Sequence, residues 1–176
     1  MKGFGLVLLL PCLLLAACGL DSEPQLSSPY TLATWTENKV SGEIRLGWDE
    51  TGQAWLEAVF MPEEGCHLYS KDLPLEGVDG LGRPTQIEVI QGGSLVADGN
   101  ISDSVAAIPD ADIPGLFIYP VGEVILTLLV ELPQGDGWYD EQVSITYMAC
   151  KDGRCYPPVE AKIIPVRIPG VEEIGG

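Results

Sequence analysis

Two cysteines with a turn between them are the residues best placed to do chemistry in this sequence. Cys150 and Cys155 are separated by four residues, and the Asp152-Gly153 pair between them favours a tight turn that doubles the chain back. The two sulfurs can therefore meet in a disulfide. The chain-entropy relation gives about 2 kcal/mol for a closed loop of about six residues, against about 4.5 kcal/mol for one of about 85, such as a Cys66 to Cys150 bond. The near pair is therefore a weak staple but suits thiol-disulfide exchange, because its thiols stay adjacent when reduced.

The spacing of this pair leaves other interpretations open. An inert hairpin disulfide is one of them, since disulfides persist in exported proteins. A metal site is disfavoured because a closed zinc site needs a second ligand pair, and the sequence offers only the distant His67. We therefore predict no metal and no cofactor. Lys151 and Arg154 are the only cations close to the pair in sequence, and they would favour a thiolate there.

The N-terminus has the layout of a bacterial secretory signal. Residues 1–17 contain one cation, Lys2, followed by an apolar run of about a dozen residues, which is too short for a bilayer-spanning helix. The ending Leu-Ala-Ala-Cys at residues 15–18 resembles the lipobox of bacterial lipoproteins. The resemblance implies cleavage before Cys18 and lipidation of Cys18, which would anchor the protein to a membrane. An ordinary secretory signal or a buried apolar helix are the alternatives.

Charge and composition exclude several classes of protein. The 176 residues include 9 Lys and Arg against 26 Asp and Glu, for a net charge of -17. So few cations cannot neutralise a run of phosphates or bind anionic lipid headgroups, so we expect no nucleic-acid partner. A hydrophobic fraction of 46% predicts a packed core, and the length allows one domain.

Apolar and polar residues alternate in short segments along the rest of the chain. Strands are predicted at 40–48, 54–60, 66–70, 85–90, 122–132, 142–148 and 161–168. The first two are expected to form a hairpin, and Pro165 places the last at a sheet edge or a bulge. The segment 122–132 is apolar on both faces, but its β-branched residues favour a strand over a helix. We predict an all-β, immunoglobulin-like antiparallel sandwich over residues 35–168. A tether would occupy 18–34, long connections 73–84 and 99–115, and a loose tail 169–176.

The block from residue 147 to 158, Tyr-Met-Ala-Cys-Lys-Asp-Gly-Arg-Cys-Tyr-Pro-Pro, resembles the redox centre of the N-terminal periplasmic domain of DsbD, the thiol:disulfide interchange protein. Weaker likenesses occur at 65–70, 82–85 and 119–123. The resemblance implies an immunoglobulin-like fold and exchange with thioredoxin-like proteins. It implies that Cys155 forms the mixed disulfide and that Cys150 resolves it. It also implies a cap loop over the cysteines, for which Phe117 and Tyr119 are the candidates.

These observations predict a thiol:disulfide exchange domain tethered at an extracytoplasmic, periplasm-side membrane surface. If the domain is an enzyme, its activity would be that of a protein-disulfide reductase. Its partners would be thioredoxin-like or other extracytoplasmic redox proteins. Full-length DsbD continues into further domains, so this chain is expected to obtain electrons from a separate protein. The alternative is a non-enzymatic immunoglobulin-like lipoprotein that binds a protein partner. Cys66 and His67 are expected to be a buried strand thiol and a half-exposed strand residue.

Overall fold

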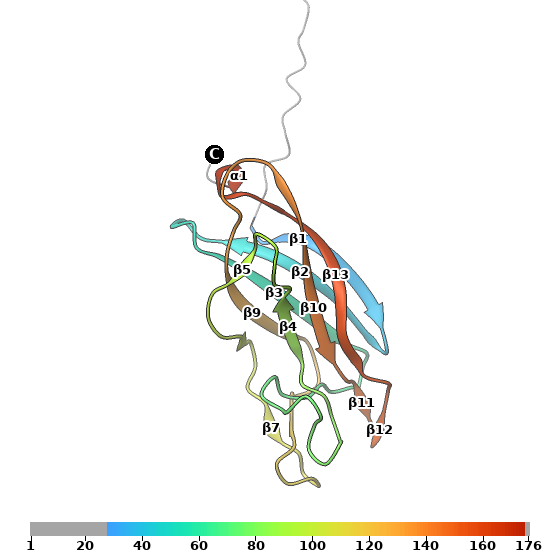
Figure 1. The fold of residues 1–176 in the computed structure, drawn as a ribbon. Helices are drawn as coiled ribbons and strands as arrows, with labels where there is room; N and C mark the ends of the chain where they lie inside the picture. Colours follow the sequence, from blue (N-terminus) through green and yellow to red (C-terminus); the bar gives the residue numbers. More distant parts are fainter. Residues whose placement is uncertain (1–27, 175–176) are drawn as a thin grey trace, which may run out of the picture.

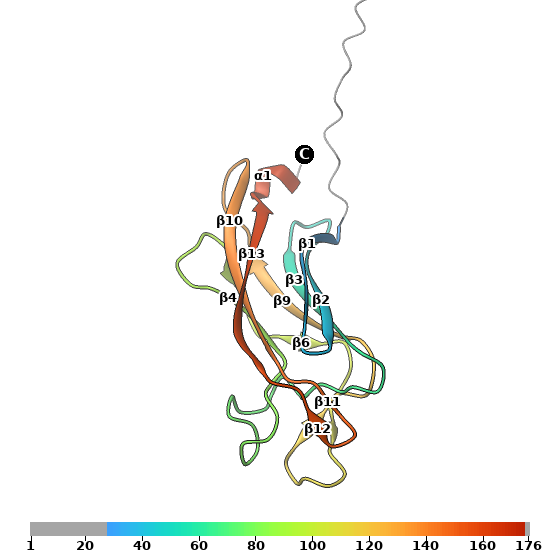
Figure 2. The same ribbon diagram turned by 90° about the vertical axis from the view of Figure 1, so that its right-hand side faces the viewer.

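The structure, a computed structural model, describes residues 28–174, and nearly all of its regular elements are strands (Figures 1 and 2). The long strands are β1 (Tyr30–Glu37), β2 (Val40–Trp48), β3 (Ala54–Pro62), β9 (Val124–Glu131), β10 (Trp138–Tyr147) and β13 (Val159–Pro169). The short ones are β4 (Gln86–Val89), β5 (Val96–Ala97), β6 (Ser102–Asp103), β7 (Ile108–Pro109), β8 (Phe117–Ile118), β11 (Cys150–Lys151) and β12 (Arg154–Cys155). One short helix, α1 (Val171–Ile174), follows β13.

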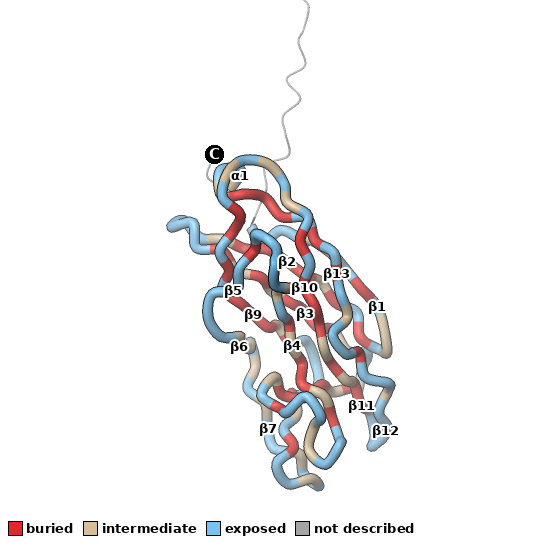
Figure 3. The backbone as a smooth tube through the Cα atoms, viewed as in Figure 1, coloured by how far each residue is buried: buried red, intermediate tan, exposed pale blue. Residues whose placement is uncertain are grey.

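Two antiparallel sheets pack face to face, which confirms the predicted immunoglobulin-like sandwich. One sheet has the order β1-β2-β3-β9-β5, with β6 also paired to β9, and the other has the order β13-β10-β4. In β2 and β9 about every second residue is buried, so one face of each of these strands packs between the sheets. Figure 3 shows the buried residues along the strands of both sheets. Fully buried members of this core include Ile44, Leu56, Phe60, Leu126 and Ile145.

The turns between neighbouring strands explain the sheet order. Asn38 and Lys39 both adopt positive φ, at 47° and 69°, and form a two-residue turn that joins β1 to β2. Strands β2 and β3 pair along their whole length, which confirms the predicted hairpin. Its loop is held by the Asp49 carboxylate, which accepts hydrogen bonds from the backbone N–H groups of Thr51 and Gln53.

The predictions for two individual strands, β9 and β13, are confirmed. The segment that is apolar on both faces forms strand β9, which lies inside its sheet between β3 and β5. Strand β13 lies at the edge of the smaller sheet, where the missing N–H of Pro165 is tolerated.

Ordered structure extends beyond the predicted bounds of the sandwich, residues 35–168, at both ends. Strand β1 begins at Tyr30, so residues 30–34 belong to the domain and not to the tether. Residues 169–174 are not loose, because the Val171 and Glu172 N–H groups donate to the carbonyl groups of Pro133 and Gly135. The predicted strand at 66–70 is reduced to isolated bridges at His67 and Tyr69.

The predicted signal sequence, residues 1–17, and the predicted lipidation site Cys18 lie outside the described residues. Within residues 28–174, no helix has the length and apolar character that a membrane span requires.

The two ends of the sandwich carry different features (Figures 1 and 2). Strand β1 begins beside α1, where the Tyr30 and Trp138 rings lie 6.2 Å apart. The β11–β12 hairpin and the loops around β7 lie at the opposite end. The candidate cysteine pair is therefore a full strand length away from the start of β1.

Candidate functional site

The β11–β12 hairpin brings the two cysteines together, and they form a disulfide. Asp152 and Gly153 have φ values of 50° and 70°, so they form a two-residue turn with Lys151 paired to Arg154. The next pair along the ladder is Cys150 and Cys155, whose Cα atoms lie 4.0 Å apart. The backbone of Cys150 bonds His67 instead, through N–H to carbonyl bonds of 3.1 and 2.9 Å. The cysteines thus occupy a non-hydrogen-bonded pair, the closer of the two pair types in an antiparallel ladder.

The two halves of the disulfide face different environments. Cys150 is 1% exposed and belongs to a small buried cluster with Tyr69, Leu73 and Leu116. Cys155 is exposed at the end of the hairpin. A thiolate arriving from solvent therefore has access to Cys155, whereas Cys150 is shielded by protein.

The hydroxyl of Tyr69 contacts both sulfurs. Its Oη lies 2.9 Å from Cys150 Sγ and 3.5 Å from Cys155 Sγ. Tyr69 is 4% exposed, and its ring and the His67 ring form a T-shaped pair with centroids 5.5 Å apart. Burial, with a smaller contribution from the Asp110 carboxylate, raises the pKa of Tyr69. Sequence analysis missed this residue, although it lies in the segment 65–70, which resembles the DsbD domain.

The segment after Cys155 is held by the β1–β2 turn. The Asn38 side chain donates from Nδ2 to the Pro157 carbonyl at 2.9 Å, and the Tyr156 N–H donates to the Ala149 carbonyl at 2.9 Å. These bonds fix the chain directly after Cys155. Sequence analysis also missed Asn38, whose only signal is an Asn-Lys pair typical of a tight turn.

The structure separates the two predicted cap residues, Phe117 and Tyr119. Tyr119 is fully buried in the main core, where its hydroxyl donates to Asp103 Oδ2 at 2.9 Å and accepts from the Lys71 N–H at 3.2 Å. Burial raises the pKa of Tyr119 strongly, so its hydroxyl stays neutral. This position is incompatible with an exposed cap, because its ring has no access to a docking partner.

Phe117 remains available for such a role. It is 42% exposed and lines a pocket of about 480 Å³ beside Leu73 and Ala106. Its carbonyl accepts from the Ser70 N–H at 3.0 Å, which ties β8 to the segment that carries Tyr69.

The two nearby cations are placed differently. Lys151 Nζ donates to the Glu64 carbonyl at 2.8 Å, so its charge is engaged by the backbone of another loop. Arg154 is exposed and makes no ion pair with any residue between 28 and 174. In an acidic protein, this leaves Arg154 as a positive charge next to the exposed sulfur.

Cys66 and His67 take the positions expected of them. Cys66 is a free thiol, 1% exposed, in the main core. His67 is half-buried, and burial lowers its pKa. In the part of the chain from 28 to 174, no three His, Cys, Asp or Glu side chains are grouped as a metal site would need.

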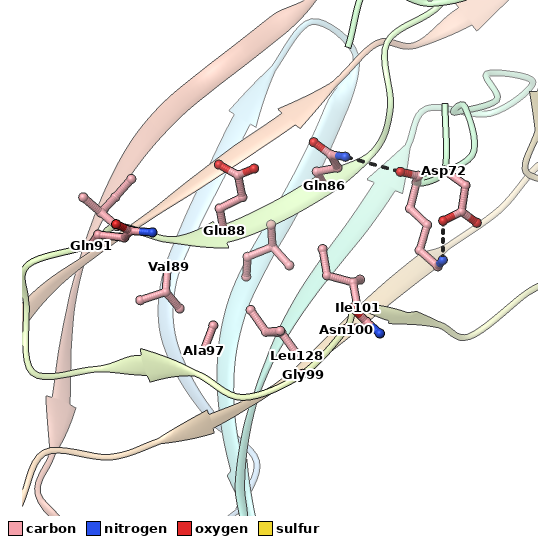
Figure 4. Close-up of a pocket in the computed structure, with 13 residues that line it drawn as sticks. Asp72, Gln86, Glu88, Val89, Gln91, Ala97, Gly99, Asn100, Ile101 and Leu128 are labelled. Carbon is pink, nitrogen blue, oxygen red and sulfur yellow. Dashed lines mark hydrogen bonds and ion pairs between the residues drawn. The ribbon is translucent and has the colours of Figure 1, made fainter. Parts of the chain in front are cut away.

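A groove lies away from the cysteines, along the edge of the sandwich between β4 and residues 97–101 (Figure 4). This groove of about 820 Å³ is lined by both polar and apolar side chains, and the apolar ones include Val89, Ile101 and Leu128. On its rim Lys71 Nζ pairs with Asp72 Oδ1 at 2.7 Å (Figure 4). Its lining contains no cysteine, histidine or hydroxyl group, so the candidate chemistry remains at the disulfide.

No family model and no curated protein matches this chain. Two solved structures are similar to it. The N-terminal domain of DsbD from Neisseria meningitidis, in its reduced form, has 19% sequence identity and a TM-score of 0.47, over 75% of this chain and 86% of that one. The N-terminal periplasmic domain of ScsB from Proteus mirabilis has 13% identity and a TM-score of 0.47, over 80% of this chain and 51% of that one.

Proposed function

We propose that this protein is a membrane-tethered, extracytoplasmic thiol:disulfide exchange domain in which Cys150 and Cys155 are the redox pair. One observation carries the proposal, namely the unequal exposure of the two cysteines within a single short-loop disulfide. An inert hairpin bond has no need of one accessible and one shielded sulfur, whereas an exchange centre needs a defined point of attack.

The exchange step follows from this asymmetry. A thiolate of a partner dithiol attacks Cys155 Sγ, a new sulfur–sulfur bond forms, and the Cys150–Cys155 bond breaks. Cys150 leaves as a thiolate and takes up a proton. The second thiol of the partner then attacks the partner sulfur of the mixed disulfide, so that the partner forms its own disulfide and Cys155 is released as a thiolate, which takes up a proton. Two electrons and two protons have then passed from the partner to this domain, and the reverse sequence reduces an oxidised partner.

The proposed partners are thioredoxin-like proteins. The ScsB structure is described as that of a periplasmic domain, which supports an extracytoplasmic location here. Arg154 adjoins Cys155 in sequence and would provide a cationic contact for a partner. Phe117 is exposed and precedes Ile118, which packs against the buried cluster that contains Cys150, so it would provide an apolar contact. Tethering rests on the lipobox-like residues 15–18. A tether there would enter the sandwich at the start of β1, the end opposite the disulfide.

Trapping of mixed disulfides tests the proposal. A Cys150→Ala variant should accumulate a Cys155-linked mixed disulfide with an extracytoplasmic thioredoxin-like protein, because no resolving thiol remains. Cys155→Ala is the matched control, and its shielded Cys150 should trap little. Absence of any adduct, together with a reduction potential below about -300 mV in a glutathione or dithiothreitol titration, would leave a structural disulfide in a partner-binding lipoprotein.

A further inference from the structure

Tyr69 supplies the one hydroxyl that contacts the cysteine pair in the described part of the chain. Its Oη is closer to Cys150 Sγ, at 2.9 Å, than to Cys155 Sγ, at 3.5 Å. Neither disulfide sulfur carries a hydrogen, so the O–H of Tyr69 must be the donor in both contacts. The group therefore already points at the sulfur that the exchange step would release.

The surroundings of Tyr69 keep this donor in place. Its backbone carbonyl accepts from Thr85 Oγ1 at 2.7 Å, and an isolated bridge joins Tyr69 to Ile118. The neighbouring His67 is bonded to the backbone of Cys150 on both its N–H and its carbonyl. The segment 67–69 thus bridges to Cys150 through His67 and to Ile118 through Tyr69, which places Tyr69 beside Cys150 although the two lie 81 residues apart in sequence. The raised pKa of Tyr69 keeps its hydroxyl protonated at neutral pH.

We propose that Tyr69 is a catalytic residue of the exchange step, in which its hydroxyl stabilises the Cys150 thiolate as it leaves and so directs attack to Cys155. This inference rests on the proposed function. The hydrogen bond strengthens as negative charge develops on the sulfur, because a bond to a charged acceptor is worth more than one to a neutral acceptor. In the reverse direction, the same bond favours the thiolate form of Cys150 that resolves a mixed disulfide.

A Tyr69→Phe variant tests this role, because it removes the hydroxyl and keeps the ring. The measurement is the rate at which dithiothreitol opens the disulfide at fixed pH, where the concentration of attacking thiolate is the same for every variant. Loss of one hydrogen bond to a developing thiolate predicts a rate about tenfold lower. Tyr156→Phe is the matched control, since Tyr156 follows Cys155 directly and its hydroxyl bonds no residue between 28 and 174. It should react at the wild-type rate.

A second readout separates this role from a merely structural one. The Cβ chemical shift of Cys150, followed by NMR against pH in reduced protein labelled at cysteine, reports its thiol pKa. In Tyr69→Phe that pKa should rise by about one unit, which is the equivalent of a tenfold change. Loss of packing alone would lower stability in urea without this shift.

The outcomes distinguish this inference from the proposed function. A wild-type disulfide that forms no mixed disulfide with any partner would overturn both. A wild-type pair that exchanges normally, with Tyr69→Phe within twofold of its rate and with an unchanged Cys150 pKa, would overturn the role of Tyr69 alone. A slower Tyr69→Phe with a raised Cys150 pKa supports it.

Discussion

Reduction of the Cys150–Cys155 bond should lower the stability of the domain only slightly. The bond links residues five apart in sequence, and for a loop of this size the chain-entropy relation gives about 2 kcal/mol. The neighbouring strands should not depend on it, because the turn at Asp152 and Gly153 and the bonds between Cys150 and His67 are formed by backbone atoms and not by the sulfurs. We therefore expect the reduced domain to stay folded and to unfold at a slightly lower urea concentration.

The stabilisation of the domain by the disulfide can be measured independently through its reduction potential. In the thermodynamic cycle of folding and reduction, a stability difference of about 2 kcal/mol equals a potential lower by about 45 mV in the folded than in the unfolded chain. Urea unfolding of the oxidised and the reduced protein gives the first value, and redox titrations in buffer and in concentrated urea give the second. The two should agree within experimental error.

A much larger effect would refute this reasoning. If the reduced protein lost 4 kcal/mol or more, or unfolded on reduction, the bond would be a structural staple and the exchange proposal would lose its basis. The Cys150→Ala/Cys155→Ala variant is the control, since dithiothreitol should not change its unfolding curve while buried Cys66 is present throughout.

Three further predictions test individual residues. Asn38→Gly should cost about 1 kcal/mol through loss of the bond to Pro157, and Asn38→Ala about 1 kcal/mol more because alanine resists positive φ, as measured by urea unfolding. Equal stability of the two variants would contradict the turn geometry. Tyr119→Phe should lower the unfolding free energy by about 2 kcal/mol through loss of the bond to Asp103, yet leave the rate of disulfide exchange unchanged; a slower exchange rate would restore Tyr119 as a cap residue. Cys18→Ala should move the protein from the membrane to the soluble fraction of cells, whereas Cys12→Ala should not; a membrane-bound Cys18→Ala protein would exclude the lipid anchor.

The strands that could be predicted are those whose burial follows their pattern. Strand β2 runs from Val40 to Trp48, as alternation predicts, because its inward side chains are apolar. Strand β1 escaped detection because only Trp35 among its residues is buried. It is defined by pairing with β2 and not by its own side chains. The ordered segment 169–174 likewise depends on distant carbonyls in the β9–β10 loop, which no local pattern reveals.

The site shows the same limit. The cysteine pair and its turn are local, so spacing alone predicted the disulfide. From the sequence alone, Tyr69 resembles any core aromatic residue. Its contact with Cys150 depends on the bridge between His67 and Cys150, which joins segments far apart in the chain. Phe117 and Tyr119 are two residues apart, yet one faces solvent and the other the core. The resemblance in sequence could place both residues in the predicted cap loop, but it could not show which side chain is buried.

The position of the disulfide at the end of the sandwich opposite the start of β1 determines how far from an anchor the reaction can occur. Strand β1 has 8 residues and spans about 26 Å. If Cys18 is anchored, the chain between it and Tyr30 adds at most about 40 Å. The exposed sulfur could then search a layer about 65 Å deep, in which partners held by the same membrane are concentrated relative to free ones. Shortening the segment 19–29 would reduce the depth of this layer. The shortened protein would then favour partners whose active sites lie closest to the bilayer.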